Sequence, residues 1–518
     1  MAFHRDGVGS WHDAPAVRTL YRAARIHTQA YPERGEWLLI DGRHVQRVGV
    51  GDPPQADRVV DLPGTTIVPG FIDAHVHLTE TGLSLANGDV RAAHSAEDLL
   101  RVVRERAADG DGPLFLLGYD ESAWDRPALP TLADLDTACA RPLMIRRADG
   151  HVALANRLAL DAAGMLDRPG VVRDETGDPT GVVTQQANDE LGLWAMSSTE
   201  DLARQDLQLQ AASLAASRGV TAVHEMSMPH WSGEADLRVL LDHRARLPVD
   251  ATAIPATTDL GTAIGNGLSA IGGDMPVDGS IGARTAWLVD PYLDGGHGVS
   301  YFADDDLAEF FHGAHAAGLQ VGVHAIGDRA IEQVLSVWER VYRALDSRER
   351  RHFRARRHRI EHLEVVTTAQ VERAAMLGLA ASVQPAFDAT WGRPGGLYEQ
   401  RLGHERAAHM NPFRTLLDRG VEVGVGSDAP ITVLDPMRAL EALERHHDRA
   451  QRLSRREAIR LHTIGSARVA HQEDKKGALA PGLHADFAAF EADPFEEPSL
   501  EDLRPVLTVS LGREVFAT

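Results

Sequence analysis

Two histidines separated by one residue, His75 and His77, lie in the segment PGFIDAHVH at residues 69–77. In an extended strand alternate side chains point the same way, so Asp73, His75 and His77 would share one face. Two imidazoles that converge in this way can hold a divalent metal ion. Because the chain contains 25 histidines, one such pair is also expected by chance. The position of this pair at the end of an apolar strand favours metal binding over a structural role.

Histidine or aspartate also ends further strand-like runs, at His224, His324, His362 and Asp428. A single histidine at such a position is usually a hydrogen-bonded core residue. Together with the first pair, however, several imidazole nitrogens and one carboxylate form the ligand set of zinc, or of another borderline divalent ion with an open coordination position. The sequence therefore predicts a metal site with room for a substrate or a water molecule.

Strand-like runs alternate with amphipathic helical windows over most of the chain, a pattern typical of parallel βα units. An enlarged (β/α)8 TIM-type barrel of the α/β class fits this pattern better than an open doubly wound sheet, and its active site would lie at the carboxyl ends of the strands. The strand-like runs are residues 219–226, 319–327, 359–364, 379–386 and 421–430, and the helical windows are residues 304–318, 329–346, 367–377 and 435–449.

Both ends of the chain have the texture of short strands and turns, and neither is long enough to build a core alone. We expect residues 1–66 and 472–518 to pair in a small β-sandwich domain beside a barrel of residues 67–471. The segment from about 80 to 210 is long for one βα connection and is predicted to be an insertion over the barrel mouth. The charge-rich segments 348–359 and 444–452 are predicted to be solvated helix faces and loops.

The composition of the chain excludes several classes of binding partner. The chain has 518 residues, with 75 acidic against 53 basic side chains and a formal charge of −22, which excludes a general nucleic-acid binder. A single cysteine excludes an internal disulfide. The first residues lack the apolar stretch of a secretory signal, and no run approaches the roughly 18 apolar residues of a membrane span. We therefore expect a cytoplasmic protein that acts on a small molecule without a membrane partner, with a homodimer as the candidate assembly.

Longer motifs around the candidate ligands resemble the amidohydrolase superfamily. PGFIDAHVHL, HAIGDRAIEQ around His324, RRHRIEHLE around His362 and GVGSDAPI around Asp428 occur in the order of that superfamily. The C-terminal segment GALAPGLHADFAAFEADPF extends the likeness. DGSIGARTAWLVDPY at residues 278–292 resembles the YtcJ-like branch, which includes N-substituted formamide deformylase. The resemblance covers nearly the whole chain.

The resemblance implies that His75, His77 and Asp428 hold one metal ion, with zinc as the expected element. His324 and His362 would hold a second ion or, with a single ion, help to coordinate it and to polarise the substrate carbonyl. The ion can lower the pKa of a bound water from about 15.7 to about 7. Asp428 would be the general base, taking the proton from that water and delivering it to the departing amine. His362 and Asp428 are thus the expected catalytic residues of a hydrolase that cleaves a non-peptide C–N bond, in a linear amide such as an N-formyl or N-acyl amine.

The absence of lysine from the predicted barrel departs from the pattern of the superfamily. Many members with two metal ions bridge them with a carboxylated lysine, whereas the only lysines here are Lys475 and Lys476, beyond the predicted barrel. A carbamate bridge is therefore excluded, and a single ion is favoured. The alternative is a bridging carboxylate, for which Glu225, Asp274 and Asp278 are the candidates.

Three residues are predicted to contact the substrate: His151, Arg284 and Trp287. Arg284 could bind a carbonyl or carboxylate through two hydrogen bonds, although a structural ion pair is equally compatible with its position. His151 and Trp287 would line the pocket, with core packing as the alternative. Two other functions remain open. One is a lyase or isomerase on the same barrel, in which the metal stabilises an enolate or carbanion, and the other is a non-catalytic ligand-binding protein.

Overall fold

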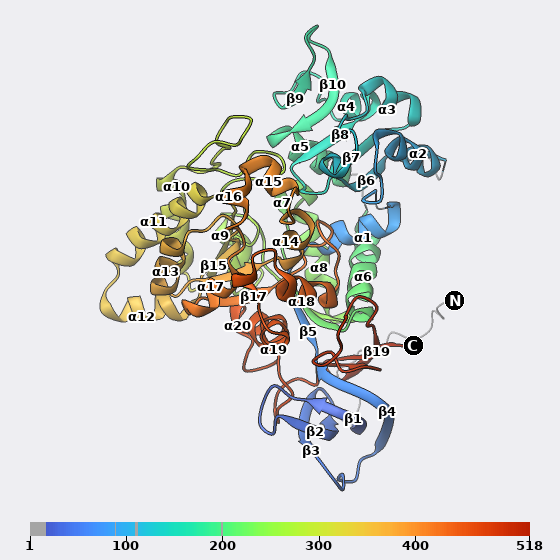
Figure 1. Cartoon of the computed structure of the whole chain (residues 1–518), viewed down its shortest axis with the longest axis vertical. Helices are drawn as coiled ribbons and strands as arrows, with labels where there is room; N and C mark the ends of the chain where they lie inside the picture. Colours follow the sequence, from blue (N-terminus) through green and yellow to red (C-terminus); the bar gives the residue numbers. More distant parts are fainter. Residues whose placement is uncertain (1–16, 89, 109–111, 198–199) are drawn as a thin grey trace.

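Short parallel strands lie at the centre of the molecule in a three-stranded and a five-stranded sheet (Figure 1). The computed structural model describes residues 17–88, 90–108, 112–197 and 200–518. The strand order is β12-β11-β5 in the first sheet and β13-β14-β15-β16-β17 in the second. These strands are β5 (Phe71–Val76), β11 (Val220–Glu225), β12 (Asp250–Ala253), β13 (Ala270–Ile271), β14 (Gln320–Ala325), β15 (Arg359–His362), β16 (Ala380–Val383) and β17 (Glu422–Val425).

Backbone hydrogen bonds connect the two parallel sheets at both of their edges. The amide of Gly272 donates to the carbonyl of Pro255 over 2.9 Å, which joins the ends of β12 and β13. The amide of Asp428 donates to the carbonyl of His75 over 2.7 Å, which joins the end of β17 to β5. The result is a TIM-barrel-like α/β fold in which the carboxyl ends of the strands lie on one side.

Helices alternate with these strands and share one large hydrophobic core with them. In that core Trp338 of α11 stacks on Phe311 of α10, with ring centroids 4.0 Å apart. The helical windows predicted from the sequence are confirmed as α10, α11, α13 and α18. The helices from residue 201 onward are α6 (Asp201–Ser217), α7 (Pro229–Ser232), α8 (Glu234–His243), α9 (Leu260–Gly265), α10 (Asp304–Ala316), α11 (Asp328–Ala344), α12 (Ser347–Ala355), α13 (Thr368–Leu377), α14 (Pro385–Trp391), α15 (Leu397–Leu402), α16 (His404–Ala407), α17 (Phe413–Asp418), α18 (Pro436–Arg445), α19 (Arg455–Arg460) and α20 (Ser466–Val469).

Both ends of the chain contribute to one seven-stranded sheet, at the bottom of Figure 1. Its order is β20-β19-β18-β4-β1-β2-β3, so the predicted pairing of the two ends is confirmed. The two-layer sandwich remains a prediction, since the strands are ordered in a single sheet, and residues 1–16 lie outside the described residues. The strands are β1 (Arg18–His27), β2 (Arg34–Asp41), β3 (His44–Gly49), β4 (Arg58–Pro69), β18 (Phe487–Phe490), β19 (Pro505–Ser510) and β20 (Arg513–Ala517).

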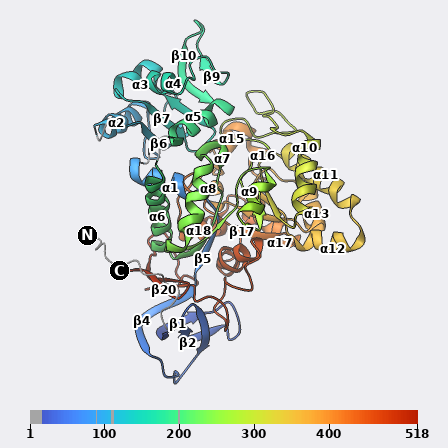
Figure 2. The same cartoon turned by 180° about the vertical axis from the view of Figure 1, so that it is seen from behind.

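A further five-stranded sheet stands at the opposite end of the molecule, and Figure 2 shows the same separation from behind. It lies within the segment that the sequence predicts as an insertion, and it has hydrophobic clusters of its own. Its order is β6-β7-β8-β10-β9. Its elements and the preceding helix are α1 (Leu78–Asn87), α2 (Ala96–Ala107), β6 (Leu114–Tyr119), α3 (Leu132–Ala138), β7 (Leu143–Arg147), β8 (Val152–Ala155), α4 (Arg157–Ala162), β9 (Val171–Arg173), β10 (Pro179–Thr184) and α5 (Gln185–Ser197).

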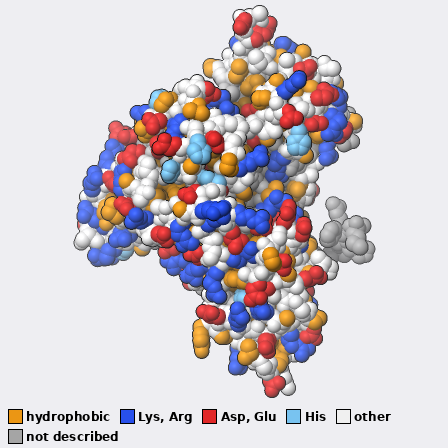
Figure 3. Space-filling view, in the orientation of Figure 1, with side chains coloured by type: hydrophobic (Ala, Val, Ile, Leu, Met, Phe, Trp, Pro, Cys, Tyr) orange, Lys and Arg blue, Asp and Glu red, His pale blue; other side chains and the backbone are white. Residues whose placement is uncertain are grey.

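The two charge-rich segments agree only in part with the prediction of solvated helix faces and loops. Arginines of α12 are exposed and gather at the left of the face in Figure 3, as predicted. His358 and Arg359 at the end of that segment are buried, because they enter β15. In the second segment His446 is fully buried, so residues 444–452 are not simply a solvated face. Within the described residues, no helix is both long and apolar enough to cross a membrane.

Arg147, the last residue of β7, ties the five-stranded sheet to the barrel loops. Its guanidinium is buried and donates to Glu121 over 2.8 Å, to Asp149 over 2.6 Å and to Asp120 over 3.0 Å. Asp120 also accepts a 3.0 Å hydrogen bond from the indole of Trp391 in α14. A single buried cation therefore compensates several carboxylates at the junction of the two parts.

Replacing Arg147 with leucine should destabilise the protein by about 2–4 kcal/mol, because three partly buried carboxylates lose their cation. Thermal unfolding followed by circular dichroism would show this loss as a lower Tm. The matched control is Arg168→Leu, since Arg168 is 59% exposed and lies 3.4 Å from Glu190. That change should cost less than about 1 kcal/mol. Equal Tm values for the two variants would contradict the role of Arg147.

Candidate active site

Imidazoles and carboxylates from separate strands meet at the carboxyl ends of the barrel strands. They come from β5, β14 and β15 and from the segments that follow β5, β13 and β17. All are buried except for the carboxylate of Asp274, whose side chain is 12% exposed. The members of this group are His75, His77, Asp274, His324, His362 and Asp428.

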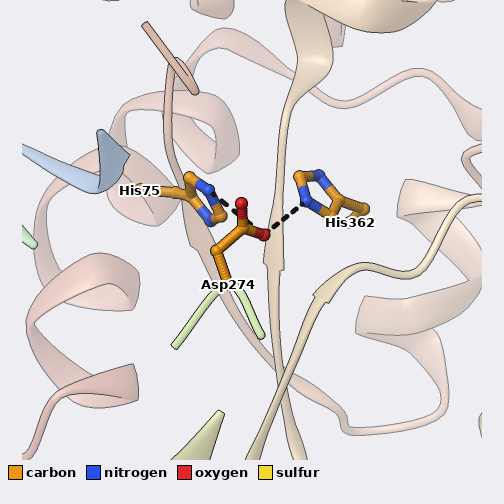
Figure 4. Close-up of side chains that lie close together, drawn as sticks. All are labelled: His75, Asp274 and His362. Atoms are coloured by element: carbon orange, nitrogen blue, oxygen red, sulfur yellow. Dashed lines mark hydrogen bonds and ion pairs between the residues drawn. The ribbon is translucent and has the colours of Figure 1, made fainter. Parts of the chain in front are cut away.

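Asp274 lies between the imidazoles, and Figure 4 shows its carboxylate between His75 and His362. Its Oδ1 is 3.0 Å from Nε2 of His362, 3.3 Å from Nδ1 of His324 and 3.7 Å from Nε2 of His75. Its Oδ2 is 3.5 Å from Nε2 of His77. One carboxylate thus reaches all four imidazoles.

Asp428 approaches the histidine pair from the end of β17. Its Oδ1 is 3.0 Å from Nε2 of His77 and 3.4 Å from Nε2 of His75. Asp428 has a φ of 53° and His362 a φ of 69°, so both lie in the left-handed region that residues other than glycine seldom adopt. Backbone strain of this kind is typical of functional sites, where the surrounding structure holds a side chain in one position.

The outward nitrogen of each imidazole has a hydrogen-bond acceptor. Nδ1 of His75 lies 2.9 Å from Glu361, whose carboxylate is itself held by the guanidinium of Arg359 at 2.8 and 2.9 Å. A proton on that nitrogen leaves the inward nitrogen unprotonated. The remaining outward pairs are His77 Nδ1 with the carbonyl of Met226 (2.9 Å), His362 Nδ1 with Oε1 of Gln384 (2.8 Å) and His324 Nε2 with the carbonyl of Gly279 (3.3 Å).

This donor set fits a divalent metal ion. Histidines that ligate metals almost always donate their other ring N–H to a carboxylate, an amide or a carbonyl, as these do. The inward Nε2 of His75 and the Oδ1 of Asp428 are buried, and neither has a hydrogen bond of good geometry despite their proximity. Unpaired buried polar atoms of this kind are costly, and a bound cation would satisfy both.

The electric field of the site favours a cation as well. Burial lowers the pKa of His75, but the carboxylates of Asp428 and Asp274 outweigh this effect and raise that pKa well above its ordinary value. Burial likewise lowers the pKa of His77, while the carboxylate of Asp428, 3.0 Å from Nε2 of His77, raises it to about 9. Protons and a metal ion compete for the same inward lone pairs, so an ion that binds here displaces protons.

Glycines bring Asp274 to the centre. Gly272 and Gly273 directly follow the short strand β13 and have φ values of 89° and 49°. A Cβ atom on Gly272 would lie 2.1 Å from the carbonyl oxygen of Gly322 in β14. Only glycine allows this close approach and the turn that follows it.

The other carboxylates considered as bridging ligands are engaged elsewhere. Asp278 accepts hydrogen bonds from the amides of Ile326 and Gly327, at 3.0 and 2.8 Å. Glu225 accepts a 2.7 Å hydrogen bond from the amide of Leu78. Neither forms an ion pair with the inward nitrogens of the histidine pair, whereas Asp274 lies close to both of them.

A cavity of about 510 Å³ opens onto these ligands. His151 lines it, with its ring centroid 5.9 Å from that of His324. Arg284 and Trp287 do not line it, in contrast to the sequence-based expectation. Arg284 forms an ion pair with Asp294 near the surface, which was the structural alternative.

Trp287 and His224 also lie apart from the ligand group. The guanidinium of Arg329 lies over the ring of Trp287, 4.6 Å from its centroid. Nδ1 of His224 lies 3.2 Å from the guanidinium of Arg359, and both side chains are buried. The positions of both side chains are therefore consistent with packing and hydrogen bonding away from the cavity.

Several residues that line the cavity are not predicted from the sequence. Arg146 comes from the five-stranded sheet, and its guanidinium lies 3.9 Å from the ring centroid of Trp231. Glu364 is buried in the cavity wall and accepts a 2.5 Å hydrogen bond from the hydroxyl of Tyr398. The acidic residues next to His362 were a signal for Glu364, whereas no local signal marks a residue that a separate sheet contributes.

The sequence matches the profile of an amidohydrolase family and is similar to several proteins along most of their length. The profile described as Amidohydrolase family (Amidohydro_3) matches residues 58–516. The protein LONG AFTER FAR-RED 3 of Arabidopsis thaliana is 30% identical over 494 residues, which cover 88% of this chain and 82% of that protein. Putative amidohydrolase YtcJ of Bacillus subtilis (strain 168) is 29% identical, with 88% and 90% covered.

Two further matches extend over almost the whole chain. N-substituted formamide deformylase of Arthrobacter pascens is 24% identical over 525 residues, with 93% of each chain covered. The crystal structure of an uncharacterized metal-dependent hydrolase from Pyrococcus furiosus superposes with a TM-score of 0.72 at 28% identity, and it covers 92% of this chain and 100% of that chain.

Replacing Glu361 with glutamine should weaken metal binding by about 10–100-fold, because the charged partner that fixes the His75 tautomer is lost. Competition between the protein and a chromophoric chelator for Zn²⁺ measures this change. Glu309→Gln is the matched control, since Glu309 is exposed on α10. An unchanged affinity in Glu361→Gln would show that Glu361 does not support a metal ligand.

Proposed function

Because the chain belongs to the amidohydrolase family, we propose that it is a metal-dependent hydrolase that cleaves a non-peptide C–N bond in a small linear amide, such as an N-formyl or N-acyl amine. The observation that carries this proposal is the common orientation of the imidazoles, each with its outward nitrogen on an acceptor and its inward nitrogen toward Asp274 or Asp428. The similarity to an N-substituted formamide deformylase supports the choice of substrate class.

We assign one ion, zinc or a similar borderline metal, to His75, His77 and Asp428. Asp274 is a further ligand in this proposal, since its oxygens lie 3.5 and 3.7 Å from the same imidazoles. It would take the position that a carboxylated lysine holds in many two-ion members of the superfamily. A divalent ion bound there would lower the pKa of a water molecule and activate it for attack near neutral pH.

Asp428 is the proposed general base. An ionised carboxylate has about four lone-pair sites on its two oxygens, so Asp428 can hold the ion and still accept a proton from the attacking water. Burial raises the pKa of Asp428, but without the ion the positive charge of protonated His75 holds it well below its ordinary value. With His75 neutral and bound to the ion, the charge of the ion would have the same effect. The carboxylate is therefore ionised at neutral pH, and after accepting the proton it can deliver it to the leaving nitrogen.

His362 is proposed to help hold the ion through its unprotonated Nε2, since it belongs to one group of possible ligands with His75 and Asp274. The ion held in this way would stabilise the carbonyl oxygen of the substrate as negative charge develops on it. The ring of His362 is fixed by the hydrogen bond to Gln384 and by Phe387, whose ring lies nearly parallel at 9° and 5.8 Å away. His151 and Arg146 provide polar groups on the cavity wall, which also has an apolar surface. That apolar surface includes Phe387, Trp391, Tyr398 and Ile431.

The family assignment also supports a proposal for the organisation of the chain. We infer a closed eight-stranded barrel over residues 67–471, with the segment from about 80 to 210 as an insertion whose residues form part of the cavity wall. Residues 1–66 and 472–518 would form the second domain. The hydrogen bonds between the two parallel sheets support closure of the barrel.

Replacing Asp428 with asparagine should lower kcat by about 10²–10⁴-fold, because the amide cannot accept the proton. Steady-state kinetics on an N-formyl amine and elemental analysis of the same sample separate catalysis from metal binding, and much of the ion should remain bound. Asp418→Asn is the control, since Asp418 is 61% exposed on α17. Full activity of Asp428→Asn would contradict the assigned base.

Turnover in water labelled with ¹⁸O should place the label in the carboxylate product, because hydrolysis transfers the solvent oxygen to the carbonyl carbon. Mass spectrometry of the product measures this incorporation, with the product of an unlabelled reaction as the control. A lyase or isomerase on the same barrel would give a product without solvent oxygen, and that result would overturn the assignment as a hydrolase.

A further inference from the structure

A second group of metal-ligating side chains lies outside the residues that line the catalytic cavity. It consists of Asp388 on α14 and of His446 and His447, which directly follow α18. His446 is 0% exposed, Asp388 is 2% exposed and the side chain of His447 is 12% exposed. The burial of these residues is the feature that contradicts the expectation of a solvated segment at residues 444–452.

Both imidazoles turn to the same carboxylate oxygen. Nδ1 of His447 contacts Oδ1 of Asp388, and Nε2 of His446 lies 3.3 Å from that oxygen. One ligand atom from each side chain lies within 4.8 Å of the others, as in the catalytic group. Nε2 of His446 is buried and has no hydrogen bond of good geometry.

The nitrogens that face away from Asp388 have carbonyl partners. Nδ1 of His446 lies 3.2 Å from the carbonyl of Asp448, and Nε2 of His447 lies 3.3 Å from the carbonyl of Ala408. Protons on these two nitrogens leave both nitrogens near Asp388 free to bind a cation. This is the same outward arrangement that surrounds the catalytic histidines.

The other tautomer of His446 would give an arrangement that needs no metal ion. With its proton on Nε2, Nδ1 accepts a 3.0 Å hydrogen bond from the amide of Asp448. Asp388 is then part of an ion pair with the imidazoles, and no metal is needed. The poor geometry between Nε2 of His446 and Asp388 argues against this arrangement, and the experiment below distinguishes the two.

Gly392 leaves open the space beside these ligand atoms. A Cβ atom at this position would lie 2.6 Å from Oδ1 of Asp388 and 3.1 Å from Nδ1 of His447. The φ of Gly392 is −82°, an ordinary value for any residue, so the backbone does not require glycine here. The close neighbours of such a Cβ atom are therefore the two ligand side chains and the backbone carbonyl oxygen of Asp388, which lies 2.8 Å away.

We propose that Asp388, His446 and His447 bind a structural divalent ion, zinc or a similar borderline metal, that fastens α14 to the end of α18. Two imidazole nitrogens and one carboxylate oxygen are ligands of the type such ions prefer, and solvent beside His447 would supply the fourth position. Because α14 also carries Phe387 and Trp391 of the cavity wall, the ion would hold that wall in place at a distance from the chemistry.

The test is elemental analysis of the full-length protein after equilibration with Zn²⁺ and removal of the unbound ion. Asp388→Asn and His447→Asn should each contain one ion per chain fewer than the parent protein. His404→Asn should match the parent, since His404 is 81% exposed and outside the group. The comparison between variant and parent does not depend on how many ions the catalytic site holds.

Gly392→Ala provides a second variant that keeps every ligand residue. The added methyl group should exclude the same ion, so that Gly392→Ala contains one ion per chain fewer than the parent, and Zn²⁺ should raise its Tm less than it raises the Tm of the parent, whether or not Asp388→Asn folds. A His75→Asn variant should lose the catalytic ion and retain this one, which separates the two sites. Metal contents of Gly392→Ala and His447→Asn equal to that of the parent would overturn the proposal and leave an ion pair.

Discussion

Two carboxylates, the buried one of Asp428 and the largely buried one of Asp274, face the same imidazoles. The compensation of their charge is the constraint on which the site depends. A carboxylate removed from water without a partner costs several kcal/mol. Four histidines lie close enough to provide that compensation, by accepting protons or by sharing a cation. The outward acceptors decide between these alternatives, since each holds a proton on the far side of its ring and leaves the near side for a metal ion.

The fold satisfies this constraint because parallel strands of a TIM-barrel-like structure end on one side. Strand β5 brings His75, and His77 directly follows the strand with its side chain toward the same site. Strands β14 and β15 bring one ligand each. The carboxylates come from irregular backbone. Asp274 follows two glycines with positive φ, and Asp428 itself has a φ of 53°. Strands place the imidazoles, and strained turns place the charges that the imidazoles must balance.

These two modes of positioning explain how much the sequence predicts. The alternation along β5 and the order of strands and helices follow from local patterns, so the convergence of His75 and His77 and the helices α10, α11, α13 and α18 are predicted correctly. The choice of Asp274 over Glu225 and Asp278 depends on a close approach between neighbouring strands, which no local pattern contains. Only its chemical type suggests that Arg284 contacts the substrate, and its actual partner, Asp294, lies in a loop. The burial of His446 likewise depends on α14, which is distant in the sequence.

The proposed chemistry requires a cation at the centre of the ligand group. Anomalous diffraction from crystals of the full chain tests the presence of that cation most directly. Data collected on the two sides of the zinc absorption edge should show a peak within bonding distance of Nε2 of His75, Nε2 of His77 and an oxygen of Asp428. Maps in which these atoms bond directly to one another, with no anomalous peak between them after equilibration with zinc, would contradict the central claim.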